Sequence, residues 1–366
     1  MRRLCSSLAA SLLAAVSWGS AQATTLFMGA YPDSVLVFDE GKGAVVQRIP
    51  LESGLPTSLR QSADKKRIYV TTITHSGIEV IDPTTRKVVE SFSLNTPTTH
   101  YRFNGGAPDP TGKYFYTVIE QIDKKLDHYE VSKPKYAVID LEKKAISNTF
   151  DVASEDENGA RGYRNLMAVS PDGKYIYQFR NKVVILDAST FKVIERMDLS
   201  TPEEAGIDSV NLGGTLESIT QPGQFVALFN ASDPYVHNKV FGIARFDLST
   251  RQVDFTPIGP APATMAGLQV SPDGKAAYTV VSTGGNLGNK RCEFWRFDMA
   301  TKSIQQKAEF SCRTRFTLGM SGDGAKLYIY GAGFQIEVYD TRTLKYERTW
   351  DLNSDITGAG MIVTQR

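Results

Sequence analysis

Cysteine is scarce in this chain, and its spacing excludes several kinds of redox site. The 366 residues contain three cysteines, at Cys5, Cys292 and Cys312. No C-x-x-C-H motif occurs, which excludes a covalently attached c-type haem, and no C-x-x-C motif occurs, which argues against a thioredoxin-like redox pair. We therefore expect this chain to bind no cofactor of its own.

Excess charge and long apolar runs are also missing. The chain has 41 Lys and Arg residues against 40 Asp and Glu, a formal net charge of +1. No basic tract stands out, so we expect no nucleic-acid partner. An apolar stretch at residues 8–16 is shorter than the ~20 residues that a membrane-spanning helix needs, and no other run approaches that length. We expect no membrane span.

The apolar stretch belongs to a predicted signal peptide at residues 1–23. Arg2 and Arg3 form its basic start, and Ala21–Ala23 provides an A-x-A cleavage site. Cleavage after Ala23 would release a periplasmic chain that begins at Thr24. The loss of the two arginines would change the net charge from +1 to −1.

Removal of the signal peptide would leave Cys292 and Cys312 as an even pair in an oxidising compartment. Cys292 opens a predicted strand at 291–298, and Cys312 follows the next predicted strand at 303–310. A hairpin of these two strands brings Cys292 close to the end of the second one. We predict a disulfide at the rim of the sheet, and two free thiols are the alternative.

No self-contained catalytic or metal-binding motif is present. The chain lacks a G-x-S-x-G nucleophile motif. Its histidines show neither H-x-H nor H-E-x-x-H spacing. The run Gly284–Gly288 is followed by no helix, so we interpret it as a loop rather than a phosphate site. We predict no catalytic, cofactor-binding or metal-binding residue in this chain. The four histidines are His75, His100, His128 and His237.

What the chain has in abundance is a repeated turn-and-strand unit. At Ser170–Tyr177 a Pro-Asp-Gly turn leads into an apolar strand, and the unit recurs along the chain. A second marker, an apolar strand that ends in aspartate, occurs seven times at intervals of 42 to 60 residues. A period of this size with four strands per unit is typical of a β-propeller. The aspartates are Asp39, Asp82, Asp140, Asp187, Asp247, Asp298 and Asp340.

We therefore predict an all-β, seven-bladed β-propeller with four antiparallel strands per blade, as a single domain at residues 24–366. The first unit lacks an innermost strand, and an extra strand at Gly360–Thr364 follows the last unit. We predict that this C-terminal strand completes blade one. Such closure would leave no long exposed sheet edge.

The connections between strands should lie on two opposite faces. Turns like Pro171–Gly173 are short and uniform, and we call their face the turn face. The connections at the other end vary in length, as at residues 120–135, and we call their face the elaborated face. We expect any local function there. Aromatic and arginine side chains concentrate interface energy, so they are our candidate partner-docking residues, although they could also be ordinary rim residues. The candidates are His100, Tyr101, Arg102, His128, Tyr129, Arg313 and Arg315.

Two segments resemble known families. Tyr69–Thr72, with the sequence YVTT, is similar to the motif of exported YVTN-type propellers. Leu126–Val131 (LDHYEV), followed by Tyr136–Asp140 (YAVID), resembles a loop and strand in the β subunit of bacterial quinohaemoprotein amine dehydrogenase. The opening at Tyr31–Asp39 is also similar, as is most of the chain. The loops of blades four and five depart from that family.

The second resemblance implies a periplasmic complex that oxidatively deaminates primary amines. Its partners would be a diheme cytochrome c subunit, which carries haem c, and a small cysteine-rich subunit, which carries cysteine tryptophylquinone. This chain would pack against the small subunit and help to enclose the quinone site. Two alternatives stay open: a solo periplasmic YVTN-type propeller that acts as a binding or scaffold module, and a propeller lactonase.

Overall fold

The computed structural model describes residues 24–161, 166–179, 183–197, 209–213, 223–232, 239–262, 264–284, 289–313, 315–331 and 333–365. The predicted signal peptide and His237 lie outside these residues. The described parts form strands β1 to β29 and one short helix, α1 (Glu157–Ala160). The prediction of an all-β chain is confirmed.

Four sheets contain four antiparallel strands each, paired in the order of the sequence. The first is β4 (Pro56–Gln61), β5 (Ile68–Thr72), β6 (Gly77–Asp82) and β7 (Lys87–Ser93). The second is β14 (Leu166–Val169), β15 (Tyr175–Phe179), β16 (Val183–Asp187) and β17 (Val193–Met197). The third is β18 (Ser209–Gly213), β19 (Gln224–Ser232), β20 (Lys239–Asp247) and β21 (Gln252–Pro260). The fourth is β22 (Thr264–Val270), β23 (Ala276–Thr283), β24 (Arg291–Asp298) and β25 (Ser303–Phe310).

Two larger sheets complete the described structure. One has six strands: β8 (Thr99–Phe103), β9 (Ala107–Pro108), β10 (Tyr114–Lys124), β11 (Tyr129–Val131), β12 (Lys135–Asp140) and β13 (Ala145–Asp151). The other has seven strands in the order β26-β27-β28-β29-β1-β2-β3. Their bounds are Thr317–Met320, Lys326–Tyr330, Gly333–Asp340, Tyr346–Gln365, Thr24–Ala30, Ser34–Asp39 and Ala44–Pro50.

Strand β29 joins the two ends of the chain. Its first part pairs with β28, and its second part pairs with β1, where Thr364 lies opposite Thr25. Ile356 is the point of exchange, because it lies opposite Gly333 on one side and opposite Ala30 on the other. The predicted pairing of the C-terminal strand with the first strand is therefore present.

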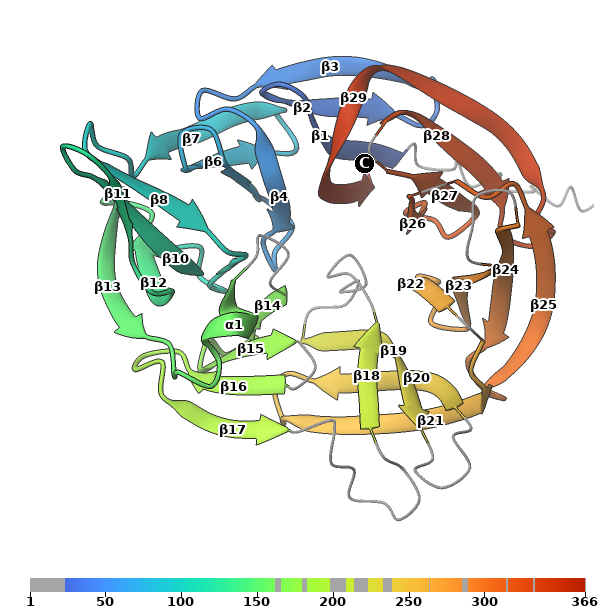
Figure 1. Cartoon of the computed structure of the whole chain (residues 1–366). Coiled ribbons are helices and arrows are strands. Elements are labelled where there is room, and N and C mark those ends of the chain that lie inside the picture. The colour runs from blue at the N-terminus through green and yellow to red at the C-terminus, as the bar shows by residue number, and fades with distance from the viewer. Residues whose placement is uncertain are drawn as a thin grey trace, which may run out of the picture.

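The sheets stand side by side around a central axis, as the blades of a propeller do (Figure 1). The apolar core lies between neighbouring sheets. Phe179 and Phe225, for example, come from adjacent sheets, and their ring centroids are 4.1 Å apart. Middle strands such as β16 are buried on both sides and have continuous apolar sequences, whereas the outer strand β25 alternates between more and less exposed residues.

Two local hydrogen-bond patterns explain the repeated sequence markers. In the turn at Ser170–Gly173, the Ser170 hydroxyl donates to Asp172 at 2.6 Å, and Gly173 has a φ of 73°. At the end of β16, Asp187 accepts hydrogen bonds from the amides of Ser189 and Thr190, at 3.0 and 2.8 Å. These short-range bonds hold the turns on one face of the molecule.

Candidate functional site

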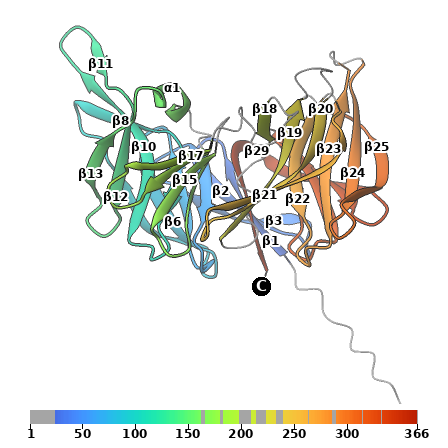
Figure 2. The same cartoon turned by 90° about the horizontal axis from the view of Figure 1, so that it is seen from below.

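The elaborated face carries the largest departure from the four-stranded pattern. Figure 2 shows β11 and α1 at one end of the molecule and the C-terminus at the other. Strand β10 has 11 residues and extends beyond its pairing with β12, with β8 paired on one side and β11 on the other. We call the structure formed by β8, β11 and residues 119–124 of β10 the projection. Pairing at both edges of β10 makes the projection an ordered part of the face.

Strand β10 also determines which side of the projection each residue occupies. Tyr116 and Val118 pack in the core shared with the β14–β17 sheet. Every second residue of a strand lies on the same face, so Glu120, Ile122 and Lys124 point to that side as well. We call this the inner side of the projection.

Three of the predicted docking residues gather on the inner side. His100, Arg102 and Tyr129 are exposed, and each lies directly opposite one of the inner-side residues of β10. Tyr101 points to the other side, where it packs against the core shared with the β4–β7 sheet. His128 lies at the tip, with its Nδ1 atom 2.7 Å from the carboxylate of the preceding aspartate. The structure thus brings together three of these five residues.

Buried carboxylates that we did not predict fix the base of the projection. Glu120 is buried, and its two oxygens lie 3.0 Å from Arg161 Nε and 3.2 Å from Asn104 Nδ2. Arg161 directly follows α1. Its partner is 41 residues away in the sequence, so no local spacing could indicate the pair. An acidic residue within the apolar run of β10 was the available signal.

Two further ion pairs hold the α1 segment beside the projection. Lys133 Nζ lies 2.9 Å from Glu157 in α1. On the other side, Arg196 of β17 lies 3.1 Å from Asp156, whose side chain is fully buried. The segment is therefore attached to two neighbouring sheets, which gives the projection a fixed base.

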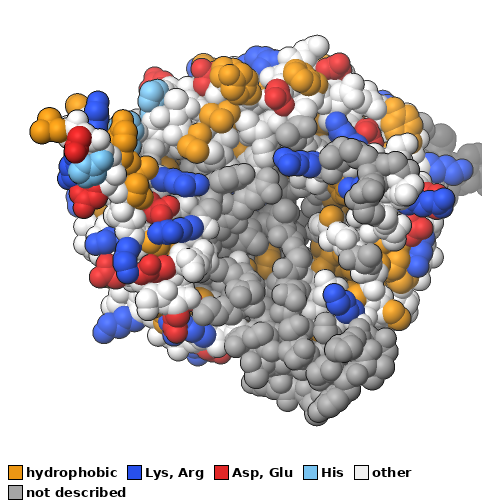
Figure 3. Space-filling view, in the orientation of Figure 1, with side chains coloured by type: hydrophobic (Ala, Val, Ile, Leu, Met, Phe, Trp, Pro, Cys, Tyr) orange, Lys and Arg blue, Asp and Glu red, His pale blue; other side chains and the backbone are white. Residues whose placement is uncertain are grey.

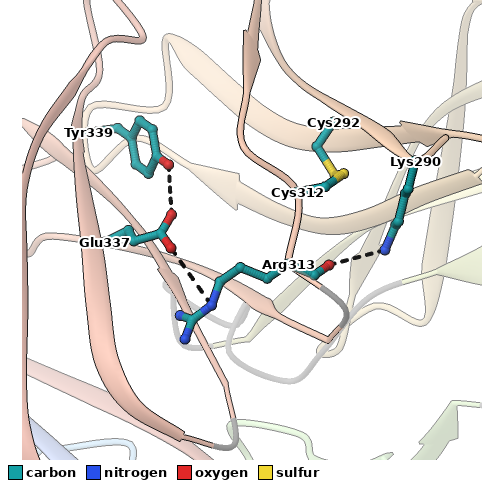
Figure 4. The surroundings of a disulfide bond; sticks show 6 residues. All are labelled: Lys290, Cys292, Cys312, Arg313, Glu337 and Tyr339. Atoms are coloured by element: carbon teal, nitrogen blue, oxygen red, sulfur yellow. Dashed lines mark hydrogen bonds and ion pairs between the residues drawn. A yellow bond between two sulfur atoms is a disulfide. The ribbon is translucent and has the colours of Figure 1, made fainter. Parts of the chain in front are cut away.

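The structure joins Cys292 and Cys312 in a disulfide (Figure 4). The bond ties β24 to the connection that leads from β25 to β26. Arg313 follows directly, and its guanidinium donates hydrogen bonds to the main-chain oxygens of Ile329 and Gln335, at 3.5 and 3.2 Å. The disulfide thus helps to hold the connection against the next group of strands.

The surroundings of Arg313 indicate a structural role for this predicted docking residue. Its Nε lies 3.7 Å from Glu337, and Tyr339 donates a hydrogen bond of 2.8 Å to the same carboxylate (Figure 4). Burial and the bond to Glu337 raise the pKa of the Tyr339 phenol well above its usual value, so Tyr339 remains the donor. Arg315 is exposed and is the arginine of this pair that a partner could reach.

Exposed apolar side chains concentrate on the elaborated face. Ten large apolar side chains are exposed among the described residues, and seven lie in connections or at strand ends of this face. Figure 3 looks onto the face and shows apolar side chains along its rim. The seven are Tyr31, Ile73, Leu126, Tyr129, Val131, Val240 and Phe334, and the other three, on outer strands, are Val89, Ile194 and Tyr346.

The turn face holds a cavity of about 1240 Å³ around the central axis. Its wall comes from innermost strands such as β4 and β29 and from the turns beneath them. The described residues contain no group of three or more His, Cys, Asp or Glu placed to hold a metal ion. No helix in the same residues is long and apolar enough to cross a membrane.

The sequence matches no protein-family model and no curated protein. In fold, the chain is similar to a functionally unknown protein from Desulfotomaculum acetoxidans DSM 771, with a TM-score of 0.55 and 12% identity over 92% of this chain and 99% of that chain. Kuenenia stuttgartiensis hydrazine synthase gives a TM-score of 0.46 at 16% identity, over 78% of this chain and 76% of that chain. The Dos1 propeller gives 0.48 at 14% identity, over 82% and 72%. At these identities the likeness concerns the fold alone.

Proposed function

We propose that this chain is the propeller subunit of a periplasmic quinohaemoprotein amine dehydrogenase complex, and that its elaborated face docks against the quinone-bearing small subunit. The observation that carries the proposal is the uneven distribution of exposed apolar side chains, seven of ten on one face. Single exposed apolar residues are ordinary, whereas a gathering on one face is typical of an interaction surface.

The segment that carries the family resemblance lies at the outermost point of that face. Leu126–Val131 forms the tip and outer strand of the projection, where Leu126 is fully exposed and Tyr129 is 65% exposed. Covering such side chains with a partner would stabilise the complex by about 25 cal/mol for each Å² of apolar surface removed from water. The fixed base of the projection would limit the entropy lost on docking.

In this complex the chain contributes binding and positioning. The quinone on the small subunit would take electrons from the amine, and the haems of the diheme cytochrome c subunit would carry them away. The inner side of the projection, with His100, Arg102 and Tyr129, would contact a partner directly. Arg315 would do so from the disulfide-linked connection.

The proposal includes a count of seven blades. Strand β29 serves two groups of strands, with β26–β28 on one side and β1–β3 on the other. Counting these groups separately, and adding the five other sheets, makes seven units. The apolar core supports the count, because its described residues form seven clusters, each between neighbouring groups of strands.

We also propose that residues 1–23 direct export and are cleaved after Ala23. Thr24 is the first residue of β1, so cleavage there would leave the first strand whole. Periplasmic export would be consistent with the disulfide between Cys292 and Cys312, because disulfides persist in oxidising compartments.

Isolation of the complex tests the proposal. An affinity-tagged chain would be purified from the periplasm of cells that express all neighbouring genes, then analysed on a native gel stained for haem and for quinone. We expect both stains, together with amine-dependent dye reduction, to migrate with the propeller. Recovery of a monomer with neither stain would overturn the proposal and favour a solo propeller module.

Matched surface variants would locate the docking face. Tyr129→Ser combined with Val131→Ser should weaken the association by about thirtyfold or more, because truncated interface anchors cost about 1–2 kcal/mol each. Val89→Ser combined with Ile194→Ser removes two similarly exposed apolar side chains from outer strands and should leave the complex intact. Equal effects of the two pairs would argue against docking at this face.

A further inference from the structure

We propose that the inner side of the projection binds an extended segment of the small subunit that carries two carboxylates four residues apart, with an apolar residue midway between them. This inference rests on the proposed docking face and adds the chemistry of the segment that occupies it. The strands of the projection divide their charged residues unequally between their two sides, and that division defines the partner.

Both cations that these strands contribute lie on the inner side. Arg102 of β8 and Lys124 of β10 are exposed, and neither forms an ion pair with another described residue. Arg102 lies opposite Glu120, but the oxygens of that carboxylate are engaged by Arg161 and Asn104. Three cations thus face one carboxylate, which leaves a net charge of +2. Figure 3 shows Lys and Arg side chains between the projection and the centre of the face.

The other side of the projection carries the remaining acidic residues of these strands. Asp123 and Glu130 lie directly opposite each other and alternate with the inner-side residues, so they point away from the inner side. The Thr99 hydroxyl donates a hydrogen bond of 2.8 Å to Asp123, and Lys125 lies 3.2 Å from Glu130. The two sides therefore differ in charge, and the inner side is the one that favours an anionic partner.

An apolar row separates the two cations. Arg102 lies opposite Glu120, which is four residues before Lys124 on β10, so the two cations lie about 13 Å apart along the strand. Ile122 is midway, and the Val131 opposite it is 57% exposed. An extended partner segment has the same repeat, so its residues i and i+4 also lie about 13 Å apart on one face. Such a segment, laid along β10, would place a carboxylate near each cation and an apolar side chain over the row between them.

The size of the cationic group favours a protein segment over a lipid surface. Clusters that bind anionic membranes typically contain about four to eight Lys and Arg residues. The inner side has a net charge of only +2, which two carboxylates would balance. The apolar row between the cations matches the alternation of an extended peptide, in which every second side chain lies on one face.

Titration with three peptides tests the charge and the spacing. The purified full chain, isotope-labelled for detection by NMR, would be titrated with acetylated and amidated TVETLTETV, with its glutamine counterpart TVQTLTQTV, and with TVTEETLTV, in which the carboxylates are adjacent. We expect saturable binding of the first peptide. The second should bind at least about fivefold more weakly, because two exposed ion pairs are lost, and the third at least about twofold more weakly, because it reaches one cation at a time. Equal affinities, or no saturable binding of the first peptide up to about 5 mM, would overturn the proposal.

Charge-reversal variants test the same surface in the complex. Arg102→Glu combined with Lys124→Glu should weaken the association with the small subunit by about tenfold or more at low salt, and by less at high salt. Lys42→Glu combined with Arg342→Glu makes the same change in net charge at exposed turns on the turn face, and it should leave the association unchanged. Thermal melts would confirm that each variant is folded.

The outcomes separate this inference from the proposed function. A complex that forms equally well with both double variants would overturn the inference and leave the proposed function standing. Selective binding of the first peptide by a chain that forms no complex would overturn the proposed function alone. Sedimentation with phosphatidylserine vesicles, together with equal affinities for the three peptides, would assign the surface to a lipid and overturn the inference.

Discussion

Replacement of the Cys292–Cys312 disulfide by two alanines should destabilise the protein by an amount that follows from its loop length. The cysteines are 20 residues apart in sequence, for which loop-closure entropy corresponds to about 3.3 kcal/mol at 25 °C. Cys292 is buried and Cys312 packs against the same apolar cluster, so the lost sulfur contacts add about 1 kcal/mol. With an unfolding entropy of about 2.1 cal/mol/K per residue over ~340 residues, a loss of about 4 kcal/mol lowers Tm by about 6 °C.

Thermal melts with and without dithiothreitol would measure this effect. We expect reductant to lower the Tm of the wild-type chain to within about 2 °C of the double variant and to leave the double variant unchanged. The disulfide and Arg313 both hold the connection that follows β25. Loss of the disulfide leaves Arg313 alone to hold it, so faster hydrogen exchange should appear at residues 311–316 in the variant. A decrease in Tm below about 1 °C, or the same response of both proteins to reductant, would refute the reasoning.

Three further predictions concern carboxylates that are buried or lie in turns. Glu79→Ala should lower the free energy of unfolding by about 2–4 kcal/mol, because the fully buried Glu79 accepts hydrogen bonds from the Ser53 amide and hydroxyl at 2.7 and 2.6 Å. Glu79→Gln keeps that acceptor and should lower the free energy of unfolding less, and urea denaturation would measure both. The Ser189 hydroxyl and nearby amides hold the pKa of Asp187 below its usual value. The contribution of Asp187 to stability is therefore complete above about pH 4 and is lost as pH falls through the lowered pKa. Asp187→Asn should therefore flatten the decline in Tm below pH 4, and an unchanged acid profile would contradict this cause. Arg161→Gln and Glu120→Gln should each destabilise, and their double-mutant cycle should give a coupling free energy of about 1 kcal/mol or more, whereas simple additivity would mean that their 3.0 Å contact contributes nothing.

Short-range features of the fold could be predicted from the sequence. Asp187 ends its strand because its carboxylate bonds to amides two and three residues later, and a pattern of that length is visible in the chain. The turn at Ser170–Gly173 is equally local. The pairing of Gly360–Thr364 with β1 was predictable for a different reason, since the first group of strands lacked an innermost member.

The candidate site depended on contacts between distant segments, and there the sequence was less informative. Arg313 is an arginine on the expected face, yet its guanidinium binds main-chain oxygens that no side-chain pattern can indicate. Tyr101 and Arg102 are neighbours in sequence but lie on opposite sides of the projection, because sides alternate along a strand and the register of β8 with β10 decides which is which. The cavity at the turn face likewise arises from several strands together.

The long strand β29 has a consequence for how the protein is made. Thr24 and Gln365 pair across the sheet, so closure requires two segments more than 300 residues apart to meet. Until β29 docks, β1 has an unpaired edge, which is prone to join other chains. Deletion of residues 356–365 should therefore cause aggregation rather than a mild loss of stability.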